Sequence, residues 1–402
     1  MVFLIEIGAE LHFCHLQCQT RAPSLTVNSP YLILSLVLFR LTLLAHLPFM
    51  VNFVVLGGHM KLEKKTHITL QDVAKHAGVS RATASLVLRG SKHITEATRV
   101  KVLASMQQLG YVYDRVAANL RSKVSTTVGL IIMELANPFY SELLVGIHQE
   151  LDKFGQTVIL GTTFDSQSIQ ERLLSTMLEH RVGGIILSAV PGSSSAPINR
   201  IEQLGIPVVL VGRRLPEANC DYVGVDNVLG GQIAVDYLVQ KGHRRIALVG
   251  GFSQLSSWQG RKQGYDHALL QAGLTIDPSL IIESPATRQG GIEAIEKLLH
   301  LPNRPTAIFC YNDTIAIGAM MKLKDAGINP GQDMAIVGFD DIPEAAIISP
   351  KLTTVSSFTR MMGAHAARLL YSRIEGSALE PTAVILKPQL IVRDSCSFTG
   401  KY

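Results

Sequence analysis

The spacing of apolar residues between Ile68 and Gly90 constrains this chain more than any other feature of its sequence. In the first half of the segment, apolar side chains recur at positions i, i+3, i+4 and i+7: Leu70, Val73, Ala74 and Ala77. This period predicts a short amphipathic helix, and the hydroxyl of Thr69 can cap it. Gly78 then allows the positive φ of a sharp turn, and Ser80 can cap a second helix. The segment therefore predicts a helix-turn-helix.

A helix-turn-helix reads DNA by placing its second helix in the major groove, where side chains near the helix N-terminus reach base edges. The inward side of this second helix is apolar: Val79, Ala84, Val87 and Leu88. The expected DNA contacts of the module are Thr69, Ser80, Arg81, Ala82, Thr83, Ser85, Leu86, Arg89 and Thr95. An ordinary helical hairpin with a glycine turn is the alternative interpretation, and the segments that follow disfavour it.

A third helix and one short segment complete this part of the chain. Thr95 can cap a helix that ends at Gly110. One side of this helix would be apolar: Val100, Leu103 and Met106. Residues 114–122 are too few to form a stable helix alone, so we expect them to fold only against another surface.

From Thr66 onward, over about 340 residues, the chain resembles the lactose and purine repressor family of transcription regulators. Those proteins carry an aromatic residue after a glycine, as in Gly110-Tyr111, followed by a hinge helix of R-V-A-x-x-L type. The matching hinge residues here are Arg115, Val116, Ala117 and Leu120. The resemblance implies that Leu120 of two subunits wedges into the minor groove and kinks the operator. The family often has arginine where this chain has Leu86, which suggests an apolar contact there.

Charge is distributed unevenly along the chain. Residues 60–125 contain twelve Lys and Arg against four Asp and Glu, whereas the whole chain has a formal net charge of +5. Positive charge is therefore concentrated where DNA phosphates would lie. Solvated helix faces also carry such runs, so the charge supports DNA binding without establishing it.

From Thr126 onward, short apolar runs alternate with helical stretches, the pattern of a parallel sheet covered by helices. Nine runs are too many for one comfortable sheet: residues 128–133, 157–161, 184–189, 208–212, 222–225, 245–250, 280–283, 307–311 and 335–339.

We therefore expect a small all-α helix-turn-helix domain, then α/β architecture in two doubly wound parallel-sheet lobes. The expected bounds are 66–112 for the DNA-binding domain, 113–124 for the hinge helix and linker, and 126–393 for a two-lobed effector-binding and dimerisation domain. The family resemblance implies that these lobes are like periplasmic binding proteins and are joined by three crossovers. We place the crossovers near Asp226, near Val355 and near a last strand at residues 384–392.

In open α/β sheets, ligands bind beyond the carboxyl ends of the strands. This rule selects residues that suit a hydroxyl-rich ligand: Asn137, Phe139, Tyr140, Ser188, Arg213, Asp226, Asn312, Asp313 and Asp340. The family resemblance adds Arg261, which would hold effector hydroxyls or carboxylates, with Trp258 one turn before it. About half of these positions fit helix caps equally well. Arg213 indicates either an effector with an acidic group or a solvated loop, and the sequence does not decide between the two.

The sequence argues against an enzyme. It contains no G-x-S-x-G, Walker A or H-E-x-x-H motif, and the adjacent Asp340 and Asp341 would diverge too much to share a proton. The five cysteines have no metal-ligand spacing and suit a reducing cytoplasm. We therefore expect no catalytic residue, no cofactor and no metal site.

The first 59 residues raise a separate question. Residues 31–56, from Tyr31 to Leu56, hold one charged residue, Arg40, and are long enough by hydropathy to cross a bilayer. A membrane-anchored transcription regulator is therefore an alternative. We expect instead that residues 1–59 are an apolar extension from a mis-assigned start. Met60 opens the short basic lead usual in the family, and the codons of the glycine pair before it would suit a purine-rich ribosome-binding site.

These expectations combine into one functional hypothesis. The chain would be a cytoplasmic repressor that binds a palindromic DNA operator as a homodimer, because one Leu120 wedge cannot fill a kinked step alone. A small-molecule effector, a sugar or sugar phosphate, would control it, and no membrane partner is expected.

Overall fold

The computed structural model describes residues 68–88, 90–112, 125–215, 217–377 and 380–397, together with two short strands, β1 (Leu4–Ile7) and β2 (Glu10–Phe13). The two strands form an antiparallel pair. Two sets of expectations lie outside the described residues: the spanning segment 31–56, and the DNA contacts of Arg89, Arg115, Ala117 and Leu120. Within the described part of the chain, no helix combines the length and hydropathy needed to cross a membrane.

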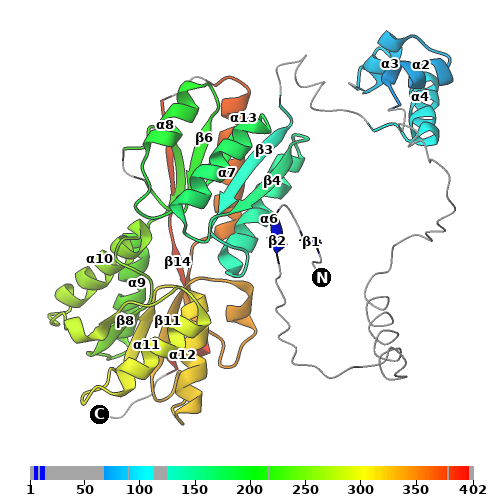
Figure 1. Ribbon diagram of the computed structural model, residues 1–402. Helices are drawn as coiled ribbons and strands as arrows, with labels where there is room; N and C mark the ends of the chain where they lie inside the picture. The colour runs from blue at the N-terminus through cyan, green and yellow to red at the C-terminus, as the bar shows by residue number, and fades with distance from the viewer. Residues whose placement is uncertain are drawn as a thin grey trace, which may run out of the picture. The chain divides into compact units, whose positions relative to one another are not determined.

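The chain divides into two compact units, residues 1–112 and 113–402. In the first unit, the described helices are α2 (Leu70–His76), α3 (Arg81–Leu88) and α4 (Glu96–Leu109) (Figure 1). They enclose a small buried core: Val73, Ala74, Ala84, Val87 and Val102. The predicted turn between α2 and α3 is present, and Gly78 adopts a φ of +69° there. The apolar stripes on the two short helices therefore face one another across a glycine turn, as their period requires.

The predicted inward face of the third helix was wrong at Val100 and Leu103 and right at Met106. Val100 and Leu103 are 56% and 49% exposed, whereas Val102 is fully buried. Met106 and Leu109 pack against the same core, so the stripe that faces α2 and α3 follows the i, i+4, i+7 spacing that starts at Val102. Several apolar residues of this helix could have formed the inward face, and packing selected among them.

The second unit contains two lobes, each built on a six-stranded sheet with flanking helices (Figure 1). The first lobe has the strand order β13-β7-β6-β5-β3-β4, and every neighbouring pair is parallel. Its elements are β3 (Thr127–Ile132), α6 (Pro138–Asp152), β4 (Thr157–Thr162), α7 (Gln167–Glu179), β5 (Gly184–Leu187), α8 (Ala196–Gln203), β6 (Val208–Val211), β7 (Asp221–Val225), α13 (Thr359–Ile374) and β13 (Ala383–Leu386). Strands β5, β6 and β7 are buried along their whole length, which explains their continuous apolar sequence.

The second lobe has the strand order β14-β12-β11-β10-β8-β9 and is parallel except for β14, which pairs antiparallel with β12. Its elements are α9 (Asn227–Gln240), β8 (Ile246–Val249), α10 (Ser256–Gln271), η1 (Pro278–Leu280), β9 (Ile281–Ile282), α11 (Arg288–Leu299), β10 (Ala307–Cys310), α12 (Asp313–Asp325), β11 (Ala335–Asp340), η2 (Pro343–Ala346), β12 (Thr353–Ser356), β14 (Gln389–Ile391) and η3 (Asp394–Cys396). Two mostly parallel sheets in two lobes confirm the predicted fold class.

The chain crosses between the lobes three times. It leaves the first lobe after β7 at Asp226, returns after β12 at Ser357, and leaves again after β13. The single last strand expected at residues 384–392 is two strands, β13 in the first lobe and β14 in the second. Lys387 and Pro388 separate them, and Pro388 cannot donate the backbone hydrogen bond that a continuous ladder would need.

Close helix packing in both lobes depends on glycines. A Cβ on Gly264 of α10 would collide with the carbonyl of Val228 on α9, and one on Gly231 of α9 would collide with the carbonyl of Arg261. Helices α6 and α13 approach through Gly146 and Gly363 in the same way. Helix α10 carries Arg261. Its close packing on α9 therefore fixes the position of Arg261 relative to the ends of β10 and β11.

Candidate functional site

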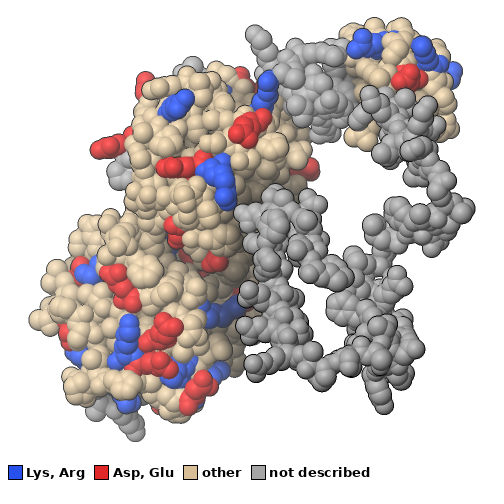
Figure 2. Space-filling view, viewed as in Figure 1, with Lys and Arg blue, Asp and Glu red and all other residues tan. Residues whose placement is uncertain are grey.

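Helix α3 presents the face expected of a DNA-reading helix. Arg81, Ala82 and Leu86 are exposed, while Ala84 and Val87 on the opposite side are buried. Thr83 and Ser85 lie at the border of the exposed face and are partly buried. Basic side chains lie at several points on the visible surface of this unit (Figure 2). The helix can therefore offer Arg81 and its neighbours to a groove while its inner side stays in the core.

Three of the expected DNA contacts are also helix caps. Thr69 accepts a hydrogen bond from the backbone N–H of Asp72, and the Asp72 carboxylate accepts one from the N–H of Thr69. The hydroxyl of Ser80 caps α3 in the same manner, and that of Thr95 caps α4. These oxygens are engaged, so contact with a phosphate would come from the free N–H groups of the first helical turns.

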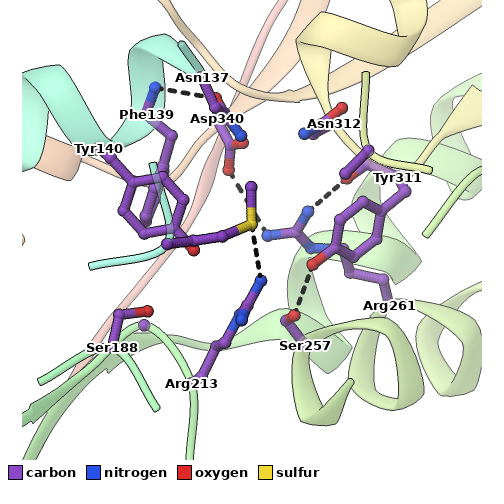
Figure 3. Close-up of a pocket in the computed structure, with 13 residues that line it drawn as sticks. Asn137, Phe139, Tyr140, Ser188, Arg213, Ser257, Arg261, Tyr311, Asn312 and Asp340 are labelled. Atoms are coloured by element: carbon purple, nitrogen blue, oxygen red, sulfur yellow. Dashed lines mark hydrogen bonds and ion pairs between the residues drawn. The ribbon is translucent and has the colours of Figure 1, made fainter. Parts of the chain in front are cut away.

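A cavity lies between the two lobes of the second unit, at the carboxyl ends of their strands (Figure 3). Its empty volume is about 460 Å³. The residues expected to bind an effector that line this cavity are Asn137, Phe139, Tyr140, Ser188, Arg213, Arg261, Asn312 and Asp340. They come together because parallel strands of both sheets end at the same cleft.

Four residues contact the guanidinium group of Arg261. Its guanidinium donates hydrogen bonds to Oδ1 of Asn227 and to the carbonyl of Tyr311. Its central carbon lies 3.6 Å from the ring centroid of Phe339 and 4.6 Å from that of Tyr311. One nitrogen lies 3.5 Å from Oδ1 of Asp340, and both side chains are buried. The position of Arg261 is therefore fixed before any ligand arrives.

Asp340 ends β11 in an unusual environment. Its Oδ1 is buried and, among the described residues, accepts no hydrogen bond, although Arg261 lies nearby. Burial raises the pKa of Asp340 to about 7, and the charge of Arg261 acts in the opposite direction. The backbone φ values of Asp340 and Asp341 are +110° and +59°, which non-glycine residues rarely adopt. An unsatisfied buried acceptor on strained backbone is a feature of ligand sites.

Arg213 lies in the cavity and not in a solvated loop. It follows β6, and its side chain is 11% exposed. Two of its nitrogens lie 2.5 and 3.3 Å from the carboxylate oxygens of Asp165, a residue in the loop after β4. Figure 3 shows Arg213 directed into the same space as Arg261. The structure therefore rules out the solvated-loop interpretation of Arg213.

Two asparagines of the cavity serve two purposes. Oδ1 of Asn137 caps α6 by accepting from the N–H of Phe139, and Oδ1 of Asn312 caps α12 by accepting from the N–H of Ile315. No hydrogen bond within the described structure uses their Nδ2 groups. Each residue can thus be a cap through its oxygen and a ligand donor through its nitrogen.

Aromatic rings form the apolar surfaces of the cavity. Phe139 and Tyr140 meet edge to face, with ring centroids 5.1 Å apart. The hydroxyl of Tyr311 lies 2.7 Å from that of Ser257, and burial raises the pKa of Tyr140. Flat rings beside fixed hydrogen-bonding groups suit a ligand with one apolar and one polar face, such as a sugar ring.

Three expected effector residues do not line the cavity. Oδ1 of Asp226 caps α9 by accepting from the N–H of Leu229. Nε1 of Trp258 donates to the carbonyl of Gly250, and the side chain is buried outside the lining of the cavity. Asp313 is fully buried and accepts hydrogen bonds from Thr354 and from the N–H of Ile342. Each has contacts that hold the fold together.

The cavity also contains residues that the sequence did not select: Met133, Gly212, Ser257, Ala286 and Tyr311. Gly212 and Tyr311 are direct neighbours of residues selected at strand ends, so a wider window there would have included them. Ser257 lies in α10 next to Trp258, which the family resemblance had selected. Met133 and Ala286 are apolar and carry no sequence signal of ligand contact. Among the described residues, no group of three or more His, Cys, Asp or Glu could hold a metal ion.

Comparison with known proteins gives one consistent result. Residues 69–114 match the bacterial regulatory proteins of the lacI family, and residues 235–396 match the periplasmic binding protein-like domain. The ribose operon repressor of Haemophilus influenzae is 32% identical over 327 residues, which are 81% of this chain and 98% of that protein. The chain belongs to the LacI family. It is a DNA-binding transcription regulator and not an enzyme.

Solved structures of LacI-family proteins resemble this one along most of their length. The lac repressor dimer bound to operator and the anti-inducer ONPF matches with a TM-score of 0.72 and 26% identity. The match covers 82% of this chain and 99% of that one. The complex of the transcriptional regulator CelR with cellobiose matches with a TM-score of 0.62 and 34% identity, over 82% of this chain and 99% of that one.

Proposed function

We propose that this LacI-family protein represses transcription in the cytoplasm, and that a small molecule in the cavity between its lobes controls it. The observation that carries this proposal is the buried Oδ1 of Asp340, which has no hydrogen-bond partner among the described residues. A ligand hydroxyl that donates to this oxygen would satisfy it. The same chain carries an exposed DNA-reading face on α3.

We propose further that the protein acts as a homodimer on a palindromic operator. The lac repressor matches 82% of this chain over 99% of its own length, and it is a dimer on its operator in the solved structure. A protein with two-fold symmetry reads two half-sites related by the same symmetry. The domain bounds that go with this proposal are 66–112 for DNA binding, 113–124 for the hinge and 126–393 for the lobes.

The cavity supports a polyhydroxylated effector. Asn137 and Asn312 offer amide donors, Asp340 offers an acceptor, and Phe139 and Tyr311 offer flat apolar surfaces. Such a set of paired polar groups beside aromatic rings fits a sugar ring. Cellobiose in the CelR complex is a ligand of this class.

The DNA proposal is tested by selecting duplexes from a random library with the purified full chain. The selected duplexes should converge on a palindrome. Arg81→Ala should lose about 1–3 kcal/mol of binding free energy on the selected duplex and tolerate changes at one position of each half-site. Lys75→Ala, which removes an exposed charge from α2, is the control and should weaken selected and random duplexes by the same factor. Equal losses on both duplexes for Arg81→Ala would contradict base reading, and selected sites without symmetry would contradict the dimer.

The effector proposal is tested with Asp340→Asn, which keeps the size of the side chain. Mono- and disaccharides, including ribose and cellobiose, are screened for their effect on operator binding in gel shifts and on the fluorescence of Trp258, the only tryptophan of the chain. Asp340→Asn should weaken the response by about tenfold or more while operator affinity without sugar stays unchanged.

The matched control for that substitution is Asp277→Asn, in the same lobe. Asp277 pairs with Arg245 and does not line the cavity. This variant should respond to the sugar like the unmodified protein. If Asp340→Asn responds at an unchanged sugar concentration, the effector does not bind through Asp340.

A further inference from the structure

The charges of the cavity come in opposed pairs. Of the thirteen residues that line it, Arg213, Arg261 and Asp340 carry a formal charge. Arg261 faces Asp340 at 3.5 Å. Arg213 is bound by Asp165, whose carboxylate lies just behind the lining. Each guanidinium therefore already has a carboxylate of its own, and in their ionised forms the two carboxylates balance the two guanidinium groups.

Several contacts hold Arg213 and Asp165 in one paired arrangement. The two residues come from different loops, after β6 and after β4, and the guanidinium contacts both carboxylate oxygens. The same guanidinium lies 3.4 Å from the carbonyl of Ala189 and 3.5 Å from the sulfur of Met133. Asp165 reaches this position with a φ of +55°, and its neighbour Phe164 has a φ of +48°. Such backbone strain persists only where the surroundings enforce it.

Among the described residues that line this cavity, none besides Arg213 and Arg261 offers a positive charge to a ligand. Arg214, next to Arg213, lies 4.7 Å from the ring centroid of Tyr222 and does not line the cavity. The buried carboxyl of Asp313, beside Asp340, can add only negative charge. The Asp165 side chain is 37% exposed, whereas Asp340 is buried. A phosphate or carboxylate group here would compete with Asp165 for Arg213 or place a second negative charge beside the buried Asp340, and either outcome is unfavourable.

We propose that the effector of this protein is uncharged, and that Asp165 sets this specificity by holding and neutralising Arg213. This proposal rests on the proposed function, because it assumes that the effector occupies the cavity. It excludes sugar phosphates and sugar acids and leaves neutral polyhydroxylated molecules. Asp165 acts through Arg213 and is thus a positioning residue, whereas Arg213 faces the ligand directly.

Inorganic phosphate tests the role of Asp165 without knowledge of the natural effector. The full chain and Asp165→Asn are titrated with phosphate at constant ionic strength, and the fluorescence of Trp258 is followed. Asparagine suits the exchange because it tolerates the positive φ of this position and removes the charge with little change of size. The unmodified protein should show no saturable response up to the highest phosphate concentration used. Asp165→Asn should reach half-saturation at a phosphate concentration at least about tenfold below that limit.

A double variant and a conservative variant separate specificity from structure. Asp165→Asn with Arg213→Ala should lose the phosphate binding that Asp165→Asn alone gains. Asp165→Glu, which keeps the charge, should not gain it. A purely structural role of Asp165 would lower stability in Asp165→Asn without creating an anion site. The proposal is overturned by saturable phosphate binding to the unmodified protein that Arg213→Ala removes, or by the absence of any gain in Asp165→Asn.

Matched pairs of sugars give the second arm of the test. Ribose and ribose 5-phosphate, glucose and glucose 6-phosphate are compared for their effect on operator binding. Any active pair should act through its neutral member, and a phosphorylated sugar that acts more strongly than its neutral partner overturns the proposal. If no palindromic operator is selected, the proposed function fails, while the phosphate titration still decides the role of Asp165.

Discussion

The pH dependence of stability around Asp340 can be predicted with its sign. Burial raises the pKa of Asp340 in the folded protein to about 7 from an ordinary value of 3.8. A carboxyl group with a raised folded-state pKa stabilises the fold fully below its unfolded pKa, and that contribution is lost as the pH rises through the folded pKa. Asparagine at this position does not titrate, so Asp340→Asn should escape the loss.

The magnitude follows from the two pKa values. Each pH unit between them corresponds to about 1.4 kcal/mol of unfolding free energy. From about pH 5 to about pH 8, the unmodified protein should therefore lose roughly 3 kcal/mol relative to Asp340→Asn. Comparing the same two proteins at two pH values removes any pH-independent effect of the exchange itself, including the altered contact with Arg261.

Urea denaturation followed by the fluorescence of Trp258 measures this difference at both pH values. Asp277→Asn serves as the control of opposite sign, because hydrogen bonds from Ser279 and Arg245 lower the pKa of Asp277. Its ionised form stabilises the fold, so Asp277→Asn should be less stable than the unmodified protein at neutral pH. If Asp340→Asn and the unmodified protein differ equally at both pH values, burial does not disfavour the charge of Asp340, and the argument fails.

Three further substitutions test the packing. Gly78→Ala meets no neighbour within 4 Å but keeps a φ of +69°, so it should cost about 1–2 kcal/mol from the backbone alone, seen as an earlier thermal transition of the DNA-binding unit. Gly264→Ala has ordinary φ but collides with the carbonyl of Val228, and this overpacking should lower the free energy of unfolding of the lobes, measured in urea, by about 1–3 kcal/mol. Asp221→Ala removes a buried carboxylate 2.8 Å from Arg373 and should cost about 3–5 kcal/mol, whereas a loss below about 1 kcal/mol would show that the pair is screened.

Local patterns predicted the DNA-binding unit well because its structure is local. The cap at Thr69, the turn at Gly78 and the cap at Ser80 each depend on residues within a few positions of one another. The inward face of α4 was predicted wrongly, since Val100 and Val102 are equally apolar and packing against α2 and α3 selects between them. Which apolar stripe of a helix becomes buried depends on the helices that pack against it.

The lobes show the same division at larger scale. Continuous apolar runs predicted the buried central strands, because a strand covered on both faces needs no polar alternation. The split of residues 384–392 into β13 and β14 was not predicted, because each half finds its pairing partner, β7 or β12, more than 30 residues away. Pairing with a strand that is distant in the sequence is determined by the tertiary structure.

The sequence alone determined which residues stand at the carboxyl ends of strands, since that depends on where each apolar run stops. It thereby brought Asn137, Arg213, Asn312 and Asp340 to one cleft. The tertiary structure alone decided which way the neighbouring side chains turn, so that Asp340 faces the cavity and Asp313 is enclosed in the fold. It also decided that Asp165, 48 positions before Arg213, is the carboxylate that pairs with it, because two loops distant in sequence meet only after the sheet has formed.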